Sequence, residues 1–466
     1  MNHACSSFHR SAAITRRRML HAGMTGMLGL TLPQLLRASS QYAAPRARIR
    51  AKRVIFLFQW GGPSHLETFD MKPEADEKFR GPHKPMRSAC PDIEVNERLP
   101  QVARIMDKVS VIRSVHHDMT NHNSAGYYAL TGKRPPSDDQ RLRENIDLFP
   151  GYGCVADRLL PHRDPAMPAH VSYPHVISDG TPTPGQFASF LGKQYDPLFV
   201  PSDPNEEAFS LPQFSLPDGL SLDRLQHRRG LQQFIDSQSR LIDYSGEARG
   251  LDEYYTKALA MLQSPRIREA FNLAAEPASI RERYGRTTYG QGCLLARRLA
   301  ESDVKFITCY FSQSIGGQST TEGGWDTHGF NNTRMFPIIE KFHLPITEQT
   351  LPTLLYDLEQ RGMLDETLVV WMGEFGRTPK INANVSRDHW PQCYSVLLAG
   401  GGVKRGFVYG KSDETGSRPA ENPVTPDVIA ATIFYLMGID PRTEVVDAQG
   451  RPLMISSGNP VMEVIS

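Results

Sequence analysis

The fold is decided by a short apolar run, Arg53-Val54-Ile55-Phe56-Leu57-Phe58-Gln59, which precedes Trp60 and the turn sequence Gly61-Gly62-Pro63. Residues that alternate along a strand point to opposite faces of a sheet, and both alternating sets are apolar here. Such a run is typical of a strand that helices cover on both faces. The glycines and the proline predict a loop at its carboxyl end.

Four further runs of the same kind alternate with segments of helical pattern. The predicted strands span 109–113, 304–311, 367–372 and 394–399, and the predicted helices span about 123–130, 289–301, 346–360 and 426–437. Pro426 stands near the first turn of the last helix and Gly438 follows its end, a common arrangement at helix boundaries. This alternation predicts an α/β protein with a doubly wound, mostly parallel sheet flanked by helices.

The segment from about 201 to 286 has a different composition, rich in Arg, Gln and Glu, with helical patterns at 220–242 and 251–263. We interpret it as a helical insertion or cap over the sheet. Surface helices that only cover one sheet face are the alternative, and the sequence does not separate the two.

The N-terminus has the pattern of an export signal. Thr15-Arg16-Arg17-Arg18-Met19-Leu20 is a twin-arginine motif, and a weakly apolar stretch interrupted by glycines follows it. That stretch is too short for a membrane-spanning helix. We therefore predict a signal peptide over residues 1–44, cleaved near Ala38 or Ala43-Ala44. The twin-arginine translocase would be the export partner, and the domain over 45–466 would be periplasmic or extracellular.

Charge and cysteine usage exclude several classes of protein. The chain has 52 Lys and Arg against 51 Asp and Glu, so it lacks the clustered basic excess of a nucleic-acid-binding protein. The five cysteines outside the predicted signal are widely spaced and form no Cys-x-x-Cys pair, so a cysteine-based zinc site is not indicated. Beyond the signal, no stretch is long and apolar enough to span a membrane.

Residues that could hold a metal ion lie in the loops of the predicted sheet. The carboxyl ends of parallel strands meet at one edge, where ligands bind. Histidine, aspartate and glutamate recur in the loops after 53–59, 304–311 and 367–372. Imidazole and carboxylate are ligands that divalent cations take. We therefore predict a site for Zn, Mn or Ca formed by His65, Asp70, Asp326, His328, Glu374, Asp388 and His389.

Several of these residues also have a simpler interpretation. His65 fits an ordinary loop histidine, Asp326 fits a turn cap, and Glu374 fits an ion pair with Arg377 that closes the end of a strand. In the functional interpretation, Arg377 clamps an anionic substrate through two parallel hydrogen bonds. Arg387 would then supply a further contact to the same anion.

The start of the helix predicted from Asn123 is a second candidate feature. Ser124 would lie where backbone N–H groups and the helix dipole favour a phosphoryl or sulfuryl group. Plain N-capping of the helix by Asn123 and Ser124 accounts for the same residues equally well.

Taken in order, these motifs resemble the alkaline phosphatase/sulfatase superfamily, and most closely the domain-of-unknown-function 1501 family of twin-arginine-exported bacterial proteins. The resemblance spans roughly residues 50–440. It rests on Gly61-Gly62-Pro63-Ser64-His65, Thr68-Phe69-Asp70, Asn121-His122, Leu130-Thr131-Gly132, Gly324-Trp325-Asp326-Thr327-His328, Glu374-Phe375-Gly376-Arg377-Thr378-Pro379, Arg387-Asp388-His389-Trp390-Pro391 and Ala399-Gly400-Gly401-Gly402.

The resemblance implies an alkaline-phosphatase-like fold, one or two divalent cations, and a nucleophile that attacks a phosphate or sulfate ester. Its implied catalytic residues are Ser124, His122 and Arg377, and the absence of cysteine near Ser124 argues against a formylglycine nucleophile. Two departures stand out. Gln59-Trp60 replaces the aspartate that usually ends the first strand, and Glu374-Phe375 replaces a usual Asp-His pair.

Two functions follow from these observations. The first is an exported metal-dependent hydrolase that acts on a small phosphorylated or sulfated substrate. The second is a non-catalytic binding or scaffold protein that keeps the fold with a degenerate metal site. A serine hydrolase is less well supported, because the Gly-x-Ser-x-Gly elbow is absent.

Overall fold

An eight-stranded sheet runs through the centre of the protein in the order β14-β4-β13-β10-β1-β9-β5-β8. A computed structural model describes residues 48–160, 164, 166–207, 209, 260–261, 264–311, 324–329 and 334–466. The strands are β1 (Arg53–Gln59), β4 (Val109–Val115), β5 (His170–Tyr173), β8 (Leu198–Phe199), β9 (Phe306–Phe311), β10 (Thr367–Met372), β13 (Tyr394–Ala399) and β14 (Phe407–Tyr409).

The direction of the strands confirms the predicted mostly parallel sheet. β1 pairs in parallel with β10 on one side and β9 on the other. β13 is antiparallel to both of its neighbours, β10 and β4, whereas β14 and β4 are parallel. Within this sheet only β13 therefore runs against the others, and its amino end lies at the edge where the other strands have their carboxyl ends.

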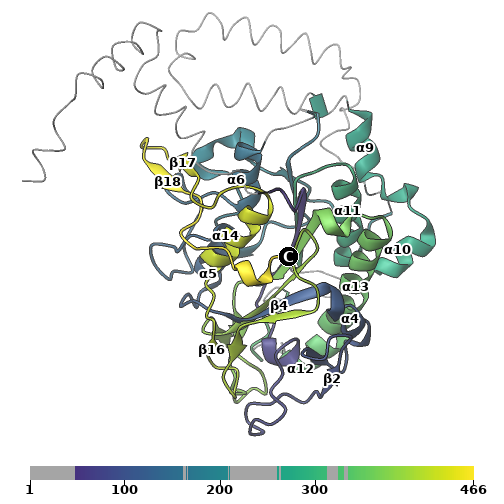
Figure 1. Cartoon of the computed structure of the whole chain (residues 1–466), viewed down its shortest axis with the longest axis vertical. Coiled ribbons are helices and arrows are strands. Elements are labelled where there is room, and N and C mark those ends of the chain that lie inside the picture. The colour runs from purple at the N-terminus through teal and green to yellow at the C-terminus, as the bar shows by residue number, and fades with distance from the viewer. Residues whose placement is uncertain are drawn as a thin grey trace, which may run out of the picture. The chain divides into compact units, whose positions relative to one another are not determined.

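Helices cover both faces of the sheet (Figure 1). One face packs against α4 (Pro100–Arg104), α9 (Pro265–Phe271), α10 (Ala278–Tyr284), α11 (Thr288–Glu301) and α13 (Leu344–Gln360). The other face packs against α5 (His122–Thr131), α6 (Tyr152–Leu159) and α14 (Pro426–Leu436). The arrangement is the doubly wound architecture that the alternation of strands and helices predicts.

The side chains of β1 show why the apolar run is nearly continuous. Ile55 and Leu57 belong to the core on the α11 and α13 side, whereas Val54, Phe56 and Phe58 belong to the core on the α5 and α14 side. All five are fully buried. Burying such a side chain contributes roughly 1.5–3 kcal/mol of stability, so both faces of this strand stabilise the sheet.

Helix α5 ends where its sequence predicts. Gly132 takes the left-handed conformation at φ 67°, and its N–H donates to the carbonyl of Tyr128 at 2.8 Å. A side chain at this position would collide with Ala430 of α14. Glycine is therefore required both to end α5 and to let it pack closely on α14.

The predicted element boundaries largely agree with the structure. β1, β10 and β13 coincide with their predicted spans, β4 continues two residues further to Val115, and β9 begins at Phe306 rather than 304. The predicted signal peptide over 1–44 and most of the predicted insertion over 201–286 lie outside the described residues. Among the residues that are described, no helix is both long and apolar enough to cross a membrane.

Candidate metal centre

Four side chains from distant parts of the chain converge at the edge of the sheet that holds the carboxyl ends of the parallel strands. His122 is the first residue of α5, Asp326 and His328 lie in the segment that follows β9, and His389 lies in β12 (His389–Trp390) ahead of β13. One ligand atom from each lies within 4.8 Å of the others. We call these four residues the imidazole cluster.

The ligand atoms of the imidazole cluster lie close to one another. Asp326 Oδ1 lies 2.7 Å from His328 Nε2 and 3.0 Å from His389 Nε2. Asp326 Oδ2 lies 3.1 Å from His122 Nε2. The Nε2 atoms of His328 and His389 are 2.9 Å apart. These are hydrogen-bond distances, shorter than the roughly 3.3 Å between donor atoms around a tetrahedral zinc ion, and all ligand atoms of the cluster lie within 4.8 Å of one another.

The opposite nitrogen of each imidazole is held by a separate oxygen atom. His122 Nδ1 lies 2.7 Å from Glu374 Oε1, His389 Nδ1 lies 2.8 Å from the Thr120 carbonyl, and His328 Nδ1 lies 3.3 Å from Asp388 Oδ1. In a neutral ring whose Nδ1 donates to this oxygen, Nε2 has a lone pair directed into the cluster. Metal-binding histidines typically have this arrangement.

Two glycines after β1 allow the loops of the site to meet. Gly61 has φ 100°, and a side chain there would collide with the backbone of Trp325 and Asp326. Its N–H donates to Glu374 Oε1 at 2.8 Å. The Trp325 N–H in turn donates to the Trp60 carbonyl at 2.9 Å. The turn after β1 thus connects the segment that carries Asp326 to the carboxylate that orients His122.

Arg377 holds Asp326 in place. It lies in β11 (Gly376–Arg377), which pairs with β12 so that Arg377 is opposite His389. Its Nη2 donates to Asp326 Oδ1 at 2.7 Å and also to the carbonyls of Gly61 and Trp325. Its Nε donates to the Gly62 carbonyl at 3.0 Å. The side chain is only 1% exposed, and its Nη1 lies 3.3 Å from the Arg387 carbonyl and 3.5 Å from His328 Nε2, at the border of the cluster.

Charges within the imidazole cluster are strongly coupled. Burial opposes protonation of His122, but the carboxylates of Asp326 and Glu374 outweigh it and raise the pKa of His122 to about 10. Burial and the neighbouring His122 lower the pKa of His389 to about 3. Burial alone would raise the pKa of Asp326, yet His122 and Arg377 hold it well below its usual range. Without a metal ion, a proton on His122 thus supplies positive charge at this position.

Solvent reaches the imidazole cluster from the side of His328 and His389. Their side chains are 15% and 20% exposed, against 6% for His122. On the inner side, the rings of Trp60 and Phe375 lie 4.8 Å and 5.0 Å from the His122 ring. Aromatic rings therefore cover the cluster on the His122 side, whereas His328 and His389 are in partial contact with solvent.

The structure places the predicted ligands His65 and Asp70 elsewhere. His65 Nε2 lies 2.8 Å from the Gly416 carbonyl. Asp70 accepts hydrogen bonds from Lys72 at 2.9 Å and from the Ser412 hydroxyl. Both are held by the loop after β1 and by residues near 412–416, so they do not belong to the converging group.

Ser124 and Arg387 also have partners outside the imidazole cluster. The Ser124 hydroxyl lies 3.0 Å from the Asp139 carbonyl and accepts from the Asp139 N–H at 2.7 Å, so it fixes the loop around residues 137–139. Arg387 is fully buried and donates to Glu67 Oε1 at 2.7 Å, to the Phe79 carbonyl at 2.7 Å and to the Thr378 carbonyl at 2.9 Å. We call His65, Glu67, Asp70 and Arg387 the Glu67 network.

Two predicted ligands take supporting positions instead. Glu374 orients His122, and Asp388 faces the Nδ1 atom of His328. The amide of Asn382 donates to Asp388 Oδ1 at 3.1 Å, a contact that sequence reasoning missed. His122, which the resemblance implies as a catalytic residue, instead lies among the four side chains that could hold a metal ion, and its position at the start of a helix beside the strand ends is the signal for that.

Several solved structures are similar to this chain at low identity and low TM-score. A sulfatase from Pseudoalteromonas sp. is 12% identical, with 86% of this chain and 70% of that chain covered and a TM-score of 0.37. A phosphonate monoester hydrolase from Silicibacter pomeroyi is 13% identical, with coverage of 89% and 76% and a TM-score of 0.33. A lipoteichoic acid synthase from Listeria monocytogenes is 10% identical, with coverage of 88% and 76% and a TM-score of 0.33.

Sequence comparison is decisive at the level of the family. No curated protein matches the chain. A family model described as "Protein of unknown function (DUF1501)" matches residues 51–465, which include every strand of the sheet and every residue of the imidazole cluster. The chain therefore belongs to the DUF1501 family.

Proposed function

We propose that this protein is a metal-dependent hydrolase of phosphate or sulfate esters, with one divalent cation held by His122, Asp326, His328 and His389. The observation that carries this proposal is the orientation of the three imidazoles. Each Nδ1 is held from outside, and each Nε2 faces the carboxylate of Asp326. Lone pairs that converge in this way repel one another unless a cation or a proton lies between them.

The donor set favours zinc or manganese over calcium. Three imidazole nitrogens suit zinc and other transition metals, whereas calcium takes oxygen ligands almost exclusively. Glu374 also fits a cation nearby. Its side chain is fully buried, and its Oε2 atom has no hydrogen-bond partner among the described residues. A buried carboxylate oxygen without a partner is costly unless positive charge lies close to it.

The surrounding residues would orient and protect the reaction centre. A bound divalent ion would supply Lewis acidity, polarising an ester oxygen and making a nucleophilic water available at neutral pH. Glu374 holds the His122 ring, Asp388 faces His328, and Arg377 fixes the position of Asp326. Substrate would enter on the exposed side of His328 and His389, which have the largest exposed fractions in the cluster.

A second function, metal binding without catalysis, is favoured by the fate of the predicted catalytic groups. The Arg377 and Arg387 guanidinium groups donate hydrogen bonds to acceptors inside the protein. The Ser124 hydroxyl is hydrogen-bonded to the backbone of residues 137–139. Among the described residues, a phosphate or sulfate ester would then meet no arginine side chain that is free of protein partners at the cluster. In this case the same four ligands would bind a structural or stored ion.

One experiment separates the two functions. The purified protein is analysed for metal content and then screened, with zinc and with manganese, against phosphate and sulfate ester substrates. The hydrolase proposal expects about one ion per chain and turnover that His389→Ala abolishes while the fold is retained. Stoichiometric metal without turnover on any ester favours the non-catalytic function, and a protein that binds no metal contradicts both.

We also propose that residues 1–44 direct export through the twin-arginine translocase, with the mature domain beginning near residue 45. The paired Arg16 and Arg17 support this proposal. Fusing the N-terminal segment to a reporter that is active only after export tests it. Replacement of both arginines by lysine should stop export, whereas export that survives this replacement would contradict the proposal.

A further inference from the structure

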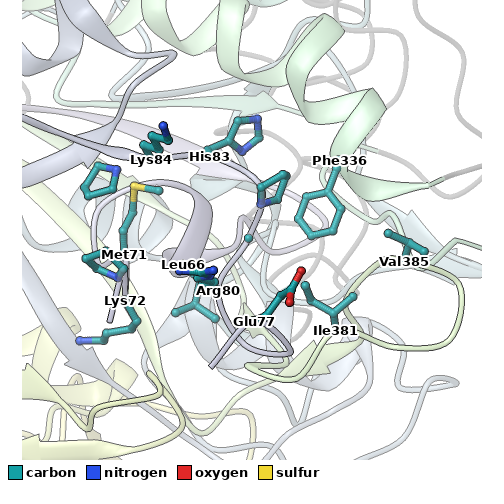
Figure 2. A pocket seen from close by; sticks show the side chains of 14 residues that line it. Leu66, Met71, Lys72, Glu77, Arg80, His83, Lys84, Phe336, Ile381 and Val385 are labelled. Atoms are coloured by element: carbon teal, nitrogen blue, oxygen red, sulfur yellow. The ribbon is translucent and has the colours of Figure 1, made fainter. Parts of the chain in front are cut away.

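A cavity of about 500 Å³ lies beside the Glu67 network, and no residue of the imidazole cluster lines it. The loop between β1 and β2 (Pro85–Arg87) forms one wall, and Phe336 with the segment 381–385 forms the other (Figure 2). Its volume lies in the range of small-molecule sites. The cavity therefore has the size of a ligand site that is separate from the candidate metal centre.

The two walls of the cavity differ in chemistry. Phe336, Ile381 and Val385 supply the apolar surface of one side, and Figure 2 shows the Glu77 carboxylate next to Phe336 and Ile381. The other wall carries cationic side chains, among them Arg80 and Lys84, which are exposed and have no carboxylate within 4 Å among the described residues. Among the described lining residues Glu77 is the one carboxylate, and Lys72 is paired with Asp70, so Arg80 and Lys84 leave a small excess of positive charge.

Val385 is held in an unfavourable backbone conformation at the rim of this cavity. Its φ is 54°, in the left-handed region that a β-branched residue rarely takes, and 56% of its surface is exposed. The turn is fixed by Asn382, whose Oδ1 accepts from the Asn384 and Ser386 N–H groups at 2.9 Å and 3.1 Å. The fold thus presents an apolar side chain to solvent at a cost, beside Ile381 and opposite the cationic wall.

Charge and apolar surface together define the ligand. We propose that this cavity binds an organic anion whose apolar body packs on Phe336, Ile381 and Val385 and whose charge lies near Arg80 and Lys84. A purely inorganic anion would leave the apolar wall exposed, and a neutral aromatic molecule would gain no attraction from the two cations. The proposal does not depend on hydrolase activity, because no ligand of the metal centre takes part.

Two matched probes test the proposal on the full chain. Naphthalene-1-sulfonate and naphthalene-1-methanol share the aromatic body and differ in charge, and their binding is measured by calorimetry. We expect saturable binding of the sulfonate at roughly fivefold or greater preference over the alcohol. The double variant Arg80→Glu/Lys84→Glu should weaken sulfonate binding by about tenfold, since two exposed charge contacts are lost. Val385→Gly should weaken both probes.

A control keeps the result specific to the cavity. Lys411→Glu/Arg442→Glu makes the same change in net charge at exposed side chains outside the cavity and should leave both affinities unchanged. Equal affinity for the two probes, equal losses in the two double variants, or no saturable binding to the unaltered protein would each overturn the proposal. A thermal unfolding curve for each variant confirms that it is folded.

Discussion

The imidazole cluster and the Glu67 network are two buried groups of histidine and carboxylate attached to loops of the same sheet. In the Glu67 network, Glu67 faces Arg387, Asp70 faces Lys72 and His65 contacts a backbone carbonyl. In the imidazole cluster, three histidines are anchored on one nitrogen and direct the other at a single carboxylate. Histidine beside aspartate in a glycine-rich loop therefore does not identify a metal site. The partners of each ring nitrogen distinguish the two groups.

The largest expected effect on stability lies in the Glu67 network. Glu67→Gln leaves the fully buried Arg387 without its charge partner, which should lower the free energy of unfolding by about 3–5 kcal/mol. Urea unfolding measures the loss. The control Glu366→Gln breaks the exposed pair with Lys52 and should cost about 1 kcal/mol or less. Equal effects of the two changes would mean that the Arg387 pair does not hold this region together.

The largest expected effect on metal binding lies at Asp326, which contacts all three histidines. Asp326→Asn keeps the shape of the side chain but removes the charge, and zinc affinity should fall by more than about 100-fold, beyond what loss of a supporting partner costs. Competition with a chelating dye measures the affinity. Asp70→Asn, the matched change in the Glu67 network, should leave zinc affinity unaltered. If Asp326→Asn retained full zinc affinity, Asp326 would not be a ligand of the ion.

A smaller effect on zinc affinity is expected at Asp388, which contacts His328 rather than the proposed ion. Asp388→Asn weakens the acceptor for His328 Nδ1, so zinc affinity should fall by about 10- to 100-fold without loss of the fold. Asp440→Asn, at a surface pair with Arg442, serves as the control. If Asp388→Asn leaves the affinity unchanged, then the Asn382 turn holds His328 in place without Asp388.

The smallest expected effect is a pH dependence of the free energy of unfolding that arises from His65. Burial lowers the pKa of His65 below its ordinary value of 6.5, so the unfolded chain takes up a proton at a pH where the folded protein does not. Stability should therefore fall as the pH drops below 6.5, by at most about 1.4 kcal/mol per pH unit. His65→Gln should show a shallower fall in urea midpoints between pH 7 and 5.5. Parallel curves for the two proteins would assign the acid sensitivity to other groups.

The fold follows closely from local patterns in the sequence. Apolar runs such as 53–59, 367–372 and 394–399 predict buried strands because both of their faces meet helices, and all three coincide with the observed strands. The reversed direction of β13 is not visible in its residues, because an apolar strand of this length has the same pattern in either direction. Loop connections and packing on β10 and β4 decide it.

The sequence by itself determined the family, the sheet and the edge at which the polar loops meet. Only the tertiary structure decided which histidines converge, because loops of irregular conformation give no period from which a side-chain direction can be read. His122 is oriented into the cluster by Glu374, and His65 is held outside it by the Gly416 carbonyl. Both partners lie more than 250 residues away in the sequence. The hydrogen-bond partners of a side chain depend on contacts between residues that are distant in the sequence. A linear motif therefore could not distinguish an Arg377 that supports Asp326 from an Arg377 that binds substrate.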